Sequence, residues 1–257
     1  MTEAAILPTR RDEAWRYSDT DALAAVGPAE LSDWREIVVP AGGHYRECLI
    51  LEDHAGPNDE TFLRRLRVNL GEGARCELFA VIASGQLGRI EIEATLATSS
   101  HFELGGITVG GRDTTREIVS RVIHAQPGAT SNQIVRSVHW GRGTGNFLGR
   151  IDVDRGAQKT AAAQSFKGLL LEKGASVNAV PQLEIFADDV KCEHGASVGQ
   201  LDEAARFYMG ARGLSPAAAR RLLVQAFIGD ALVGLGDDAA TQERLLRVAL
   251  DKLDRHL

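Results

Sequence analysis

The sequence predicts a mainly β protein with helical segments at both ends, because apolar and polar residues alternate through the middle of the chain. The alternation is clearest in Leu66–Leu70, Ile90–Leu96 and Ile151–Asp154, and each of these segments has one apolar face. Parallel strands joined by helices are excluded here, because no helical pattern of ten or more residues separates the strands. Gly-Ala pairs punctuate the same region at Gly73-Ala74, Gly128-Ala129, Gly156-Ala157, Gly174-Ala175 and Gly195-Ala196.

Two architectures fit this pattern: an antiparallel sandwich or barrel, and a solenoid of stacked parallel coils. Small-residue runs such as Gly105-Gly106 and Ala161-Ala162-Ala163 favour the solenoid, since its coils stack about 4.8 Å apart. We therefore expect three regions: an N-terminal arm over residues 1–36, a β core over 37–199 and a helical subdomain over 200–257.

The N-terminal arm is predicted to contain one short helix over residues 9–26. Thr9 or Asp12 can cap its start, and Gly27 with Pro28 should end it. The residues available for burial are Trp15, Leu23 and Val26.

The pattern becomes helical after Gly199. Asp202–Met209 predicts a helix that ends by Gly213, Ser215-Pro216 begins the next helix, and Asp237-Asp238 caps the last. The expected apolar stripes are Leu222, Leu223, Ala226 and Phe227 in the second helix, and Leu246, Leu250, Leu253 and Leu257 in the third. Each stripe must pack on a helix, on the β core or on another protein.

Composition limits the class of protein. The 257 residues are 44% hydrophobic and 25% charged, which is enough to bury a core, and the net charge of -6 argues against binding to nucleic acid or an anionic membrane. No run of about 18 apolar residues and no signal peptide is present, so we expect a cytoplasmic protein. Cys48, Cys76 and Cys192 are an odd number at wide spacings, which fits neither a disulfide framework nor a CxxC pair.

Two motifs that resemble active-site sequences are better explained as turns. The glycine-rich segment 141–145 is followed by a strand pattern and lacks the phosphate-binding Lys-Ser/Thr, so we predict a turn or bulge and no ATP site. Asp188-Asp189 should be a solvated turn. Asp152, Asp154 or Asp189 would serve a carbohydrate enzyme only if acids converged on one face, and the missing signal peptide and low Trp content argue against that class.

Cys192 and His194 lie two residues apart, so they project from the same face of an extended strand. A thiolate and an imidazole suit zinc, copper or iron-sulfur species. Two ligands do not complete a metal site, and a free cysteine is commonly a small buried residue. If the pair binds metal, a second chain should supply the remaining ligands.

The segment that contains this pair, PQLEIFADDVKCEHGASVGQLDE over residues 181–203, resembles a signature of the SufB/SufD family of iron-sulfur cluster assembly proteins. The resemblance continues through Phe207-Tyr208-Met209 and Ala211-Arg212-Gly213, and the segment Glu13–Ser18 is similar to the family's E-x-W-R-Y-T. SufB proteins carry a cysteine shortly before this signature, where Ala175 stands here, so the resemblance is to the SufD branch.

The resemblance implies a right-handed parallel β-helix with helical parts at both ends, and a non-enzymatic subunit. It implies pairing with a SufB-like scaffold through the β-helix end and docking of a SufC-like ABC ATPase on the C-terminal helices. The implied docking residues are Phe207, Tyr208, Arg212, Gly213, Leu222, Leu223 and Phe227. His194 and Cys192 would share iron or a nascent cluster with the scaffold, and no cofactor would be held stably by the chain alone. The alternative is a homodimeric β-helix module with no metal role.

Overall fold

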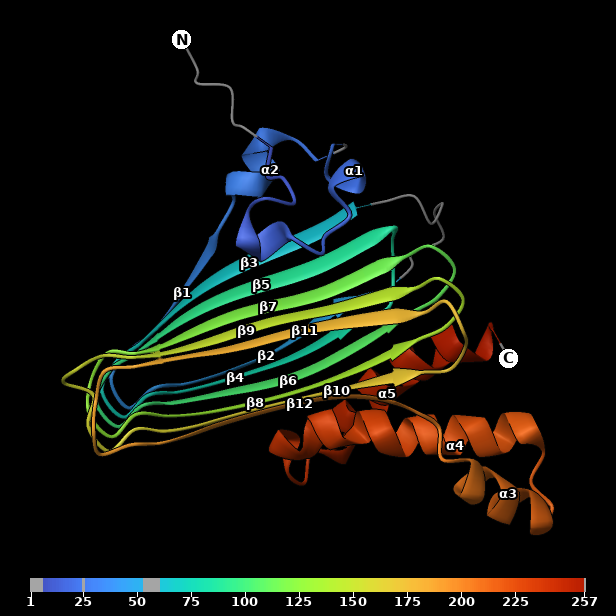
Figure 1. Cartoon of the computed structure of the whole chain (residues 1–257). Coiled ribbons are helices and arrows are strands. Elements are labelled where there is room, and N and C mark those ends of the chain that lie inside the picture. Colours follow the sequence, from blue (N-terminus) through green and yellow to red (C-terminus); the bar gives the residue numbers. More distant parts are fainter. Residues whose placement is uncertain (1–6, 25, 53–60, 257) are drawn as a thin grey trace.

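The computed structural model describes residues 7–24, 26–52 and 61–256, and its body is a β-solenoid (Figure 1). Two six-stranded parallel sheets face each other, in the orders β1-β3-β5-β7-β9-β11 and β12-β10-β8-β6-β4-β2. We refer to them as the odd-numbered and even-numbered sheets, and to one strand from each as a coil. The parallel pairing confirms the solenoid and excludes the antiparallel sandwich or barrel.

The three segments with the clearest alternation are β3, β5 and β9, and all lie in the odd-numbered sheet. The strands of this sheet are β1 (Arg35–Val39), β3 (Thr61–Leu70), β5 (Leu87–Leu96), β7 (Thr115–His124), β9 (Thr144–Val153) and β11 (Ser176–Ile185). Those of the even-numbered sheet are β2 (His44–Leu51), β4 (Arg75–Ile82), β6 (His101–Gly110), β8 (Thr130–His139), β10 (Ala161–Leu170) and β12 (Lys191–Gln200).

The core lies between the two sheets, where each coil repeats the same apolar positions. Val68, Ala94, Val122 and Ile151 are in register on successive strands of the odd-numbered sheet, and all four are fully buried. Alternate residues of a strand face opposite sides of the sheet, so the other residues lie on the outer faces of the two sheets. The alternation of apolar and polar residues in the sequence therefore reflects the odd-numbered sheet, whose apolar residues face the core.

Four of the five Gly-Ala pairs lie at turns between strands, as predicted from their positions between the alternating segments. Gly73, Gly128 and Gly174 have φ angles of +63°, +72° and +99°, a conformation that L side chains rarely adopt. The fifth pair, Gly195-Ala196, lies inside β12 and does not mark a turn.

The N-terminal arm differs from the prediction of one helix over residues 9–26. It contains three short elements: the 3-10 turn η1 (Glu13–Trp15), α1 (Thr20–Leu23) and α2 (Pro28–Ser32). Asp19 caps a new helix by accepting from the Ala22 amide, and Pro28 begins a helix instead of ending one. The predicted burial of Trp15, Leu23 and Val26 is confirmed, because these side chains pack on the odd-numbered sheet together with Leu31 and Leu87.

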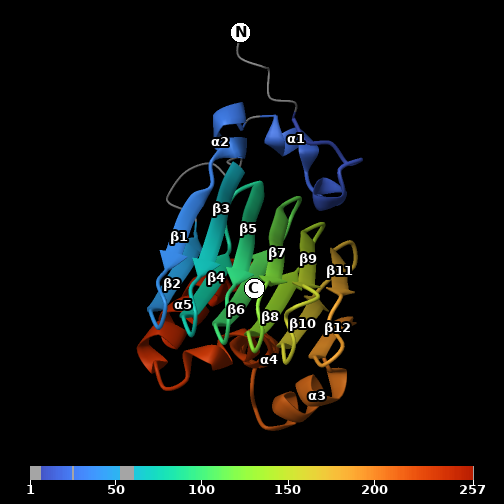
Figure 2. The same cartoon turned by 90° about the vertical axis from the view of Figure 1, so that its left-hand side faces the viewer.

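The C-terminal helices are α3 (Glu203–Ala211), α4 (Pro216–Gly229), the 3-10 helix η2 (Asp230–Leu235) and α5 (Ala239–Asp254). Their predicted caps are confirmed: the Asp202, Ser215 and Asp238 side chains each accept a backbone amide in the first turn. Figures 1 and 2 show α4, η2 and α5 against the outer face of the even-numbered sheet, whereas α3 projects away from the body.

The predicted stripes of these helices are partly wrong. The buried residues of α4 and α5 are Ala219, Val224, Ile228, Leu245, Ala249, Leu250 and Leu253. Leu222 and Ala226 are exposed, Leu246 is only half-buried, and Leu257 is outside the described residues. Both α4 faces carry apolar residues, so the sequence pattern alone did not decide which face packs on the sheet.

Candidate functional site at the open end of the solenoid

The predicted metal residues lie on the final coil, which β11 and β12 form. β12 is the last strand of the even-numbered sheet and pairs with β10, which places Cys192 beside Ala162 and His194 beside Gln164. No coil in the described part of the chain covers this end. Val198, on the same strand, therefore remains 48% exposed.

The two side chains face the interior side of this coil. Cys192 is half-buried and packs against an apolar cluster that includes Ile151 and Ala162. Because side chains alternate along a strand, His194 lies on the same face. His194 is exposed, since no further coil of the described residues stacks on it. The structure therefore brings the pair together at a place that a second molecule can reach.

Burial raises the pKa of the Cys192 thiol, and the hydrogen bond from the Ala162 backbone only partly offsets this effect. The thiol is therefore protonated at neutral pH, whereas a metal binds the thiolate. Among the described residues no three His, Cys, Asp or Glu side chains gather closely enough to hold a metal ion. The chain by itself presents two ligands of a site, one of which must lose a proton on binding.

Gln164 is a neighbour of this pair that sequence reasoning missed. Its position on β10 lies between Ala162 and Phe166, which are both buried and apolar, and Gln164 itself is 2% exposed. A glutamine at an interior-facing position of an otherwise apolar strand is the signal that could have identified it.

The predicted docking residues on α3 are exposed. No residue of this helix is buried, and Phe207 and Tyr208 are 79% and 58% exposed. The Arg212 guanidinium lies 4.5 Å from the centroid of the Tyr208 ring, and Gly213 ends the segment with φ +91°. Phe207 and Tyr208 are therefore accessible on the projecting helix, and Arg212 stacks on the Tyr208 ring just beyond its end.

The predicted docking residues on α4 divide between surface and core. Leu222 is 42% exposed and Leu223 is half-buried. Phe227 is half-buried as well, and it packs on the cluster that joins the helices to the even-numbered sheet. Leu222 is therefore accessible at the surface of α4, whereas Phe227 also supports the fold.

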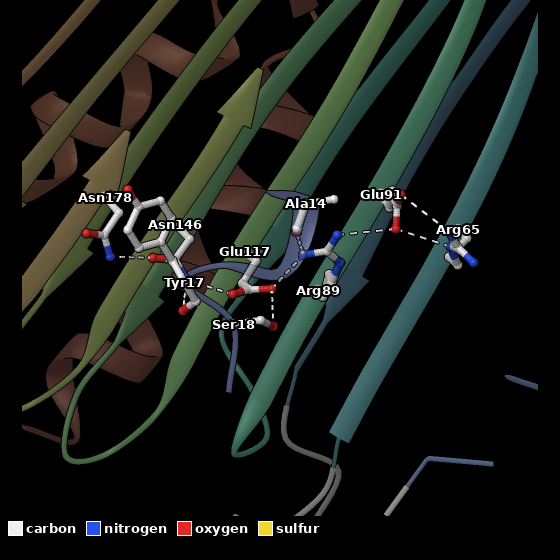
Figure 3. Close-up of polar contacts among 9 residues, drawn as sticks. All are labelled: Ala14, Tyr17, Ser18, Arg65, Arg89, Glu91, Glu117, Asn146 and Asn178. Carbon is white, nitrogen blue, oxygen red and sulfur yellow. Dashed lines mark hydrogen bonds and ion pairs between the residues drawn. The ribbon is translucent and has the colours of Figure 1, made fainter. Parts of the chain in front are cut away.

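The segment Glu13–Ser18, which carried part of the family resemblance, anchors the arm to the odd-numbered sheet (Figure 3). The Arg89 Nη1 donates to Glu117 at 2.8 Å and to the Ala14 carbonyl at 3.0 Å. The Ser18 hydroxyl donates to the same Glu117 oxygen at 2.8 Å, and Asn146 donates to the other oxygen at 2.6 Å. Arg89 and Glu117 are both buried, so the motif has a structural role.

The motifs predicted to be turns are confirmed as turns. Residues 140–143 connect β8 to β9, Thr144 and Gly145 begin β9, and Asp188-Asp189 is an exposed bend. Asp152 forms ion pairs with Arg121 at 2.7 Å and Arg150 at 2.6 Å, so its carboxylate is already neutralised by two arginines.

Within the described ranges, no helix combines the length and apolar character needed to cross a bilayer.

The fold and the site together define a β-solenoid protein whose uncovered last coil carries a Cys-x-His pair. The family model for the SUF system FeS cluster assembly, SufBD core domain, matches residues 32–227. The chain therefore belongs to the SufBD core family of the SUF iron-sulfur cluster assembly system.

Individual relatives agree with this assignment. The chain is 36% identical over 125 residues to the iron-sulfur cluster assembly protein SufD of Escherichia coli, which covers 49% of this chain and 30% of that protein. It is 37% identical over 153 residues to protein ABCI7, chloroplastic, of Arabidopsis thaliana, which covers 59% of this chain and 32% of that protein. An iron-sulfur cluster assembly SufBD family protein of Synechocystis is 33% identical over 193 residues, which covers 74% of this chain and 42% of that protein. The chain thus matches less than half the length of these relatives.

Proposed function

We propose that this chain is a non-enzymatic subunit of SUF iron-sulfur cluster assembly that pairs with a SufB-like scaffold through its final coil. The observation that carries the proposal is the uncovered coil itself, on which Cys192 and His194 stand beside exposed apolar side chains such as Val198. Uncovered strand edges favour pairing with another chain. The chain's membership in the SufBD core family supports the same role.

Iron or a nascent cluster is the cargo of this site. Cys192 and His194 supply two ligands, so the scaffold supplies the others, and the chain alone holds no cofactor stably. This arrangement confines cluster chemistry to the assembled complex, where a thiolate forms as the metal displaces its proton.

The second surface is proposed to dock a SufC-like ABC ATPase. Aromatic residues exposed to solvent, such as Phe207 and Tyr208, are typical centres of protein interfaces, and Leu222 is an exposed apolar residue on the neighbouring helix α4. Helix α4 is joined to the even-numbered sheet through Ile228 and Val224, so a movement of the ATPase would be transmitted to the solenoid.

Copurification tests the ATPase surface. Phe207→Asp and Leu222→Asp should each abolish or strongly weaken capture of the ATPase, because they place a charge in an apolar interface. Val233→Asp is the matched control: Val233 is 57% exposed but lies in η2, at the other end of α4. Capture that is equal for all three variants would refute this docking surface.

Anaerobic coexpression with the scaffold and the ATPase, followed by absorption and Mössbauer spectroscopy, tests the cluster site. His194→Ala should reduce cluster content without dissociating the complex. Glu193→Ala is the control, since Glu193 is exposed on the opposite face of the same strand. A cluster content that is indifferent to His194→Ala would remove His194 from the site.

A homodimeric module with no metal role is the second candidate, and the same exposed final coil favours it. The mass of the purified chain, measured alone and with the scaffold, separates the two. A homodimer that persists when the scaffold is added supports the second candidate. The cytoplasmic location stays a prediction, because one relative is chloroplastic.

A further inference from the structure

Gln164 is a polar side chain in an apolar wall, directly behind His194. It is in register with His194 on β12 and with Gln133 on β8. Its neighbours on the same face, Ala162 and Phe166, belong to buried apolar clusters. In-register residues of neighbouring strands lie about 4.8 Å apart, which is within the reach of a glutamine side chain.

The amide of Gln164 has unused hydrogen-bonding capacity. Among the described residues, neither its Oε1 nor its Nε2 has a hydrogen-bond partner, although Gln164 is 2% exposed. Buried polar groups are normally paired, and an unpaired one destabilises the fold. Gly149 leaves room for the amide, because a Cβ at that position would lie 2.3 Å from the Gln164 Nε2. The fold thus accommodates a glutamine where an apolar side chain of the same size would be more stable.

We propose that Gln164 is a positioning residue for His194, an inference that rests on the proposed function of the final coil. An imidazole that binds a metal through one ring nitrogen usually donates the N–H of the other to a polar acceptor, which fixes the tautomer and the ring orientation. The Gln164 Oε1, which has no partner in the structure, becomes this acceptor when the amide turns from Gly149 toward His194. Once the His194 ring donates to it, the second ring nitrogen presents its lone pair to the open end.

A buried water could satisfy the same amide by bridging Gln164 to Gln133, whose Nε2 also has no partner among the described residues. The two explanations differ in one observable. Only the positioning role makes the tautomer of the His194 ring depend on residue 164.

The test is long-range ¹H–¹⁵N NMR of the histidine rings in the full chain, which reports the tautomer directly and needs neither metal nor partner. In the wild type, His194 should populate one tautomer. Gln164→Met, which keeps the length of the side chain and removes the acceptor, should return His194 to the mixture found in water. Gln133→Met is the matched control, because it makes the same change one strand further from His194 and should leave the tautomer unchanged.

Gln164→Met should melt at the same temperature as the wild type or higher, and Gln164→Leu is the second variant if Met does not fit. In the complex, the same change should weaken retention of Fe²⁺ roughly tenfold. A tautomer mixture in the wild type, or one tautomer that survives both Gln164 variants, overturns the inference and leaves the proposed function standing. Failure of the proposed function shows separately, as cluster content unaffected by His194→Ala.

Discussion

At the scale of single residues, Arg89 and Glu117 are charged groups that the molecule buries almost completely. Arg89 also lies 3.7 Å from the centroid of the Trp15 ring, so the pair binds the arm as well as the two strands that carry it. Burial of two charges is tolerated because each satisfies the other, together with Ser18 and Asn146. Removal of one partner leaves an uncompensated charge in the interior.

Glu117→Ala should therefore lower the free energy of unfolding by about 3–5 kcal/mol and release the arm. Urea denaturation gives the first quantity, and limited proteolysis near residues 13–18 gives the second. Glu36→Ala is the control: it breaks the exposed pair with Arg67, 3.0 Å apart, and should cost less than about 1 kcal/mol. Equal losses in the two variants would contradict the structural role of the buried pair.

Two buried histidines give the molecule a pH dependence. Burial lowers the pKa of His124 to about 4, and burial with the nearby charge of Arg116 lowers the pKa of His139 to about 3. In the unfolded chain both rings take up a proton below a pKa of about 6.5. The unfolded state then binds more protons than the folded state, so stability falls as the pH falls from 6.5 toward the folded values.

Between pH 7 and 4.5 we expect each of these histidines to remove on the order of 2 kcal/mol from the free energy of unfolding. The interval from pH 7 to 4.5 lies above the pH range in which protonation of Glu77 reduces stability. Ion pairs and hydrogen bonds with Arg46 and Arg75 hold the pKa of Glu77 at about 2. Urea denaturation at both pH values should show a smaller pH effect in His139→Gln. A pH effect equal to that of the wild type would contradict the burial of a neutral ring at 139.

At the scale of elements, the packing of the C-terminal helices on the solenoid depends on a close approach at Gly105. A Cβ at this position of β6 would lie 2.2 Å from the Ala231 carbonyl oxygen in η2 and 2.7 Å from the Phe79 ring. The Arg136 guanidinium also reaches across to Asp230, with Nε donating at 2.9 Å. The close approach and this ion pair act together with the buried side chains of η2, such as Leu232, to hold it against the even-numbered sheet.

Gly105→Ala should separate η2 from the sheet, with an expected loss of about 1–3 kcal/mol from overpacking. Gly210→Ala is the control, because its added methyl group meets no described atom within 4 Å and it lies within α3. Thermal unfolding should place Gly210→Ala at or above the wild type. A Gly105→Ala protein as stable as the wild type would show that the helices tolerate a shift.

At the scale of the whole molecule, every inner strand pairs on both sides, whereas β12 pairs on one side and carries mostly exposed residues. Stability in stacked coils is approximately a sum of contributions from neighbouring coils. The final coil should therefore open more readily than the inner coils, and it is also the proposed interface.

Hydrogen exchange should show this gradient. We expect amides of β12 to exchange faster than those of β6 and β8, since local opening needs fewer lost contacts at an end than in the middle of the stack. Binding of the scaffold should slow exchange in β12 at least about tenfold while β6 is unchanged. Protection of β12 equal to that of β6 in the isolated chain would contradict an uncovered final coil.

Several features could be read from the sequence because their causes are local. The alternation in β5, the caps at Ser215 and Asp238, and the shared face of Cys192 and His194 depend on residues within a few positions of each other. The same reasoning failed for the arm, since elements of three to five residues are set by tertiary contacts rather than by intrinsic propensity.

The sequence by itself determined the strand period, most of the turns, the starts of the C-terminal helices and the candidate ligands, because backbone geometry repeats over two to four residues. Only the tertiary structure decided that Gln164 lies behind His194, that Arg89 meets Glu117, and that α4 packs through Ile228 with Leu222 outside. Strand neighbours in adjacent coils are 26 to 32 residues apart, so their pairing depends on the length of every turn between them. That register is a property of the stacked chain, and no local pattern encodes it.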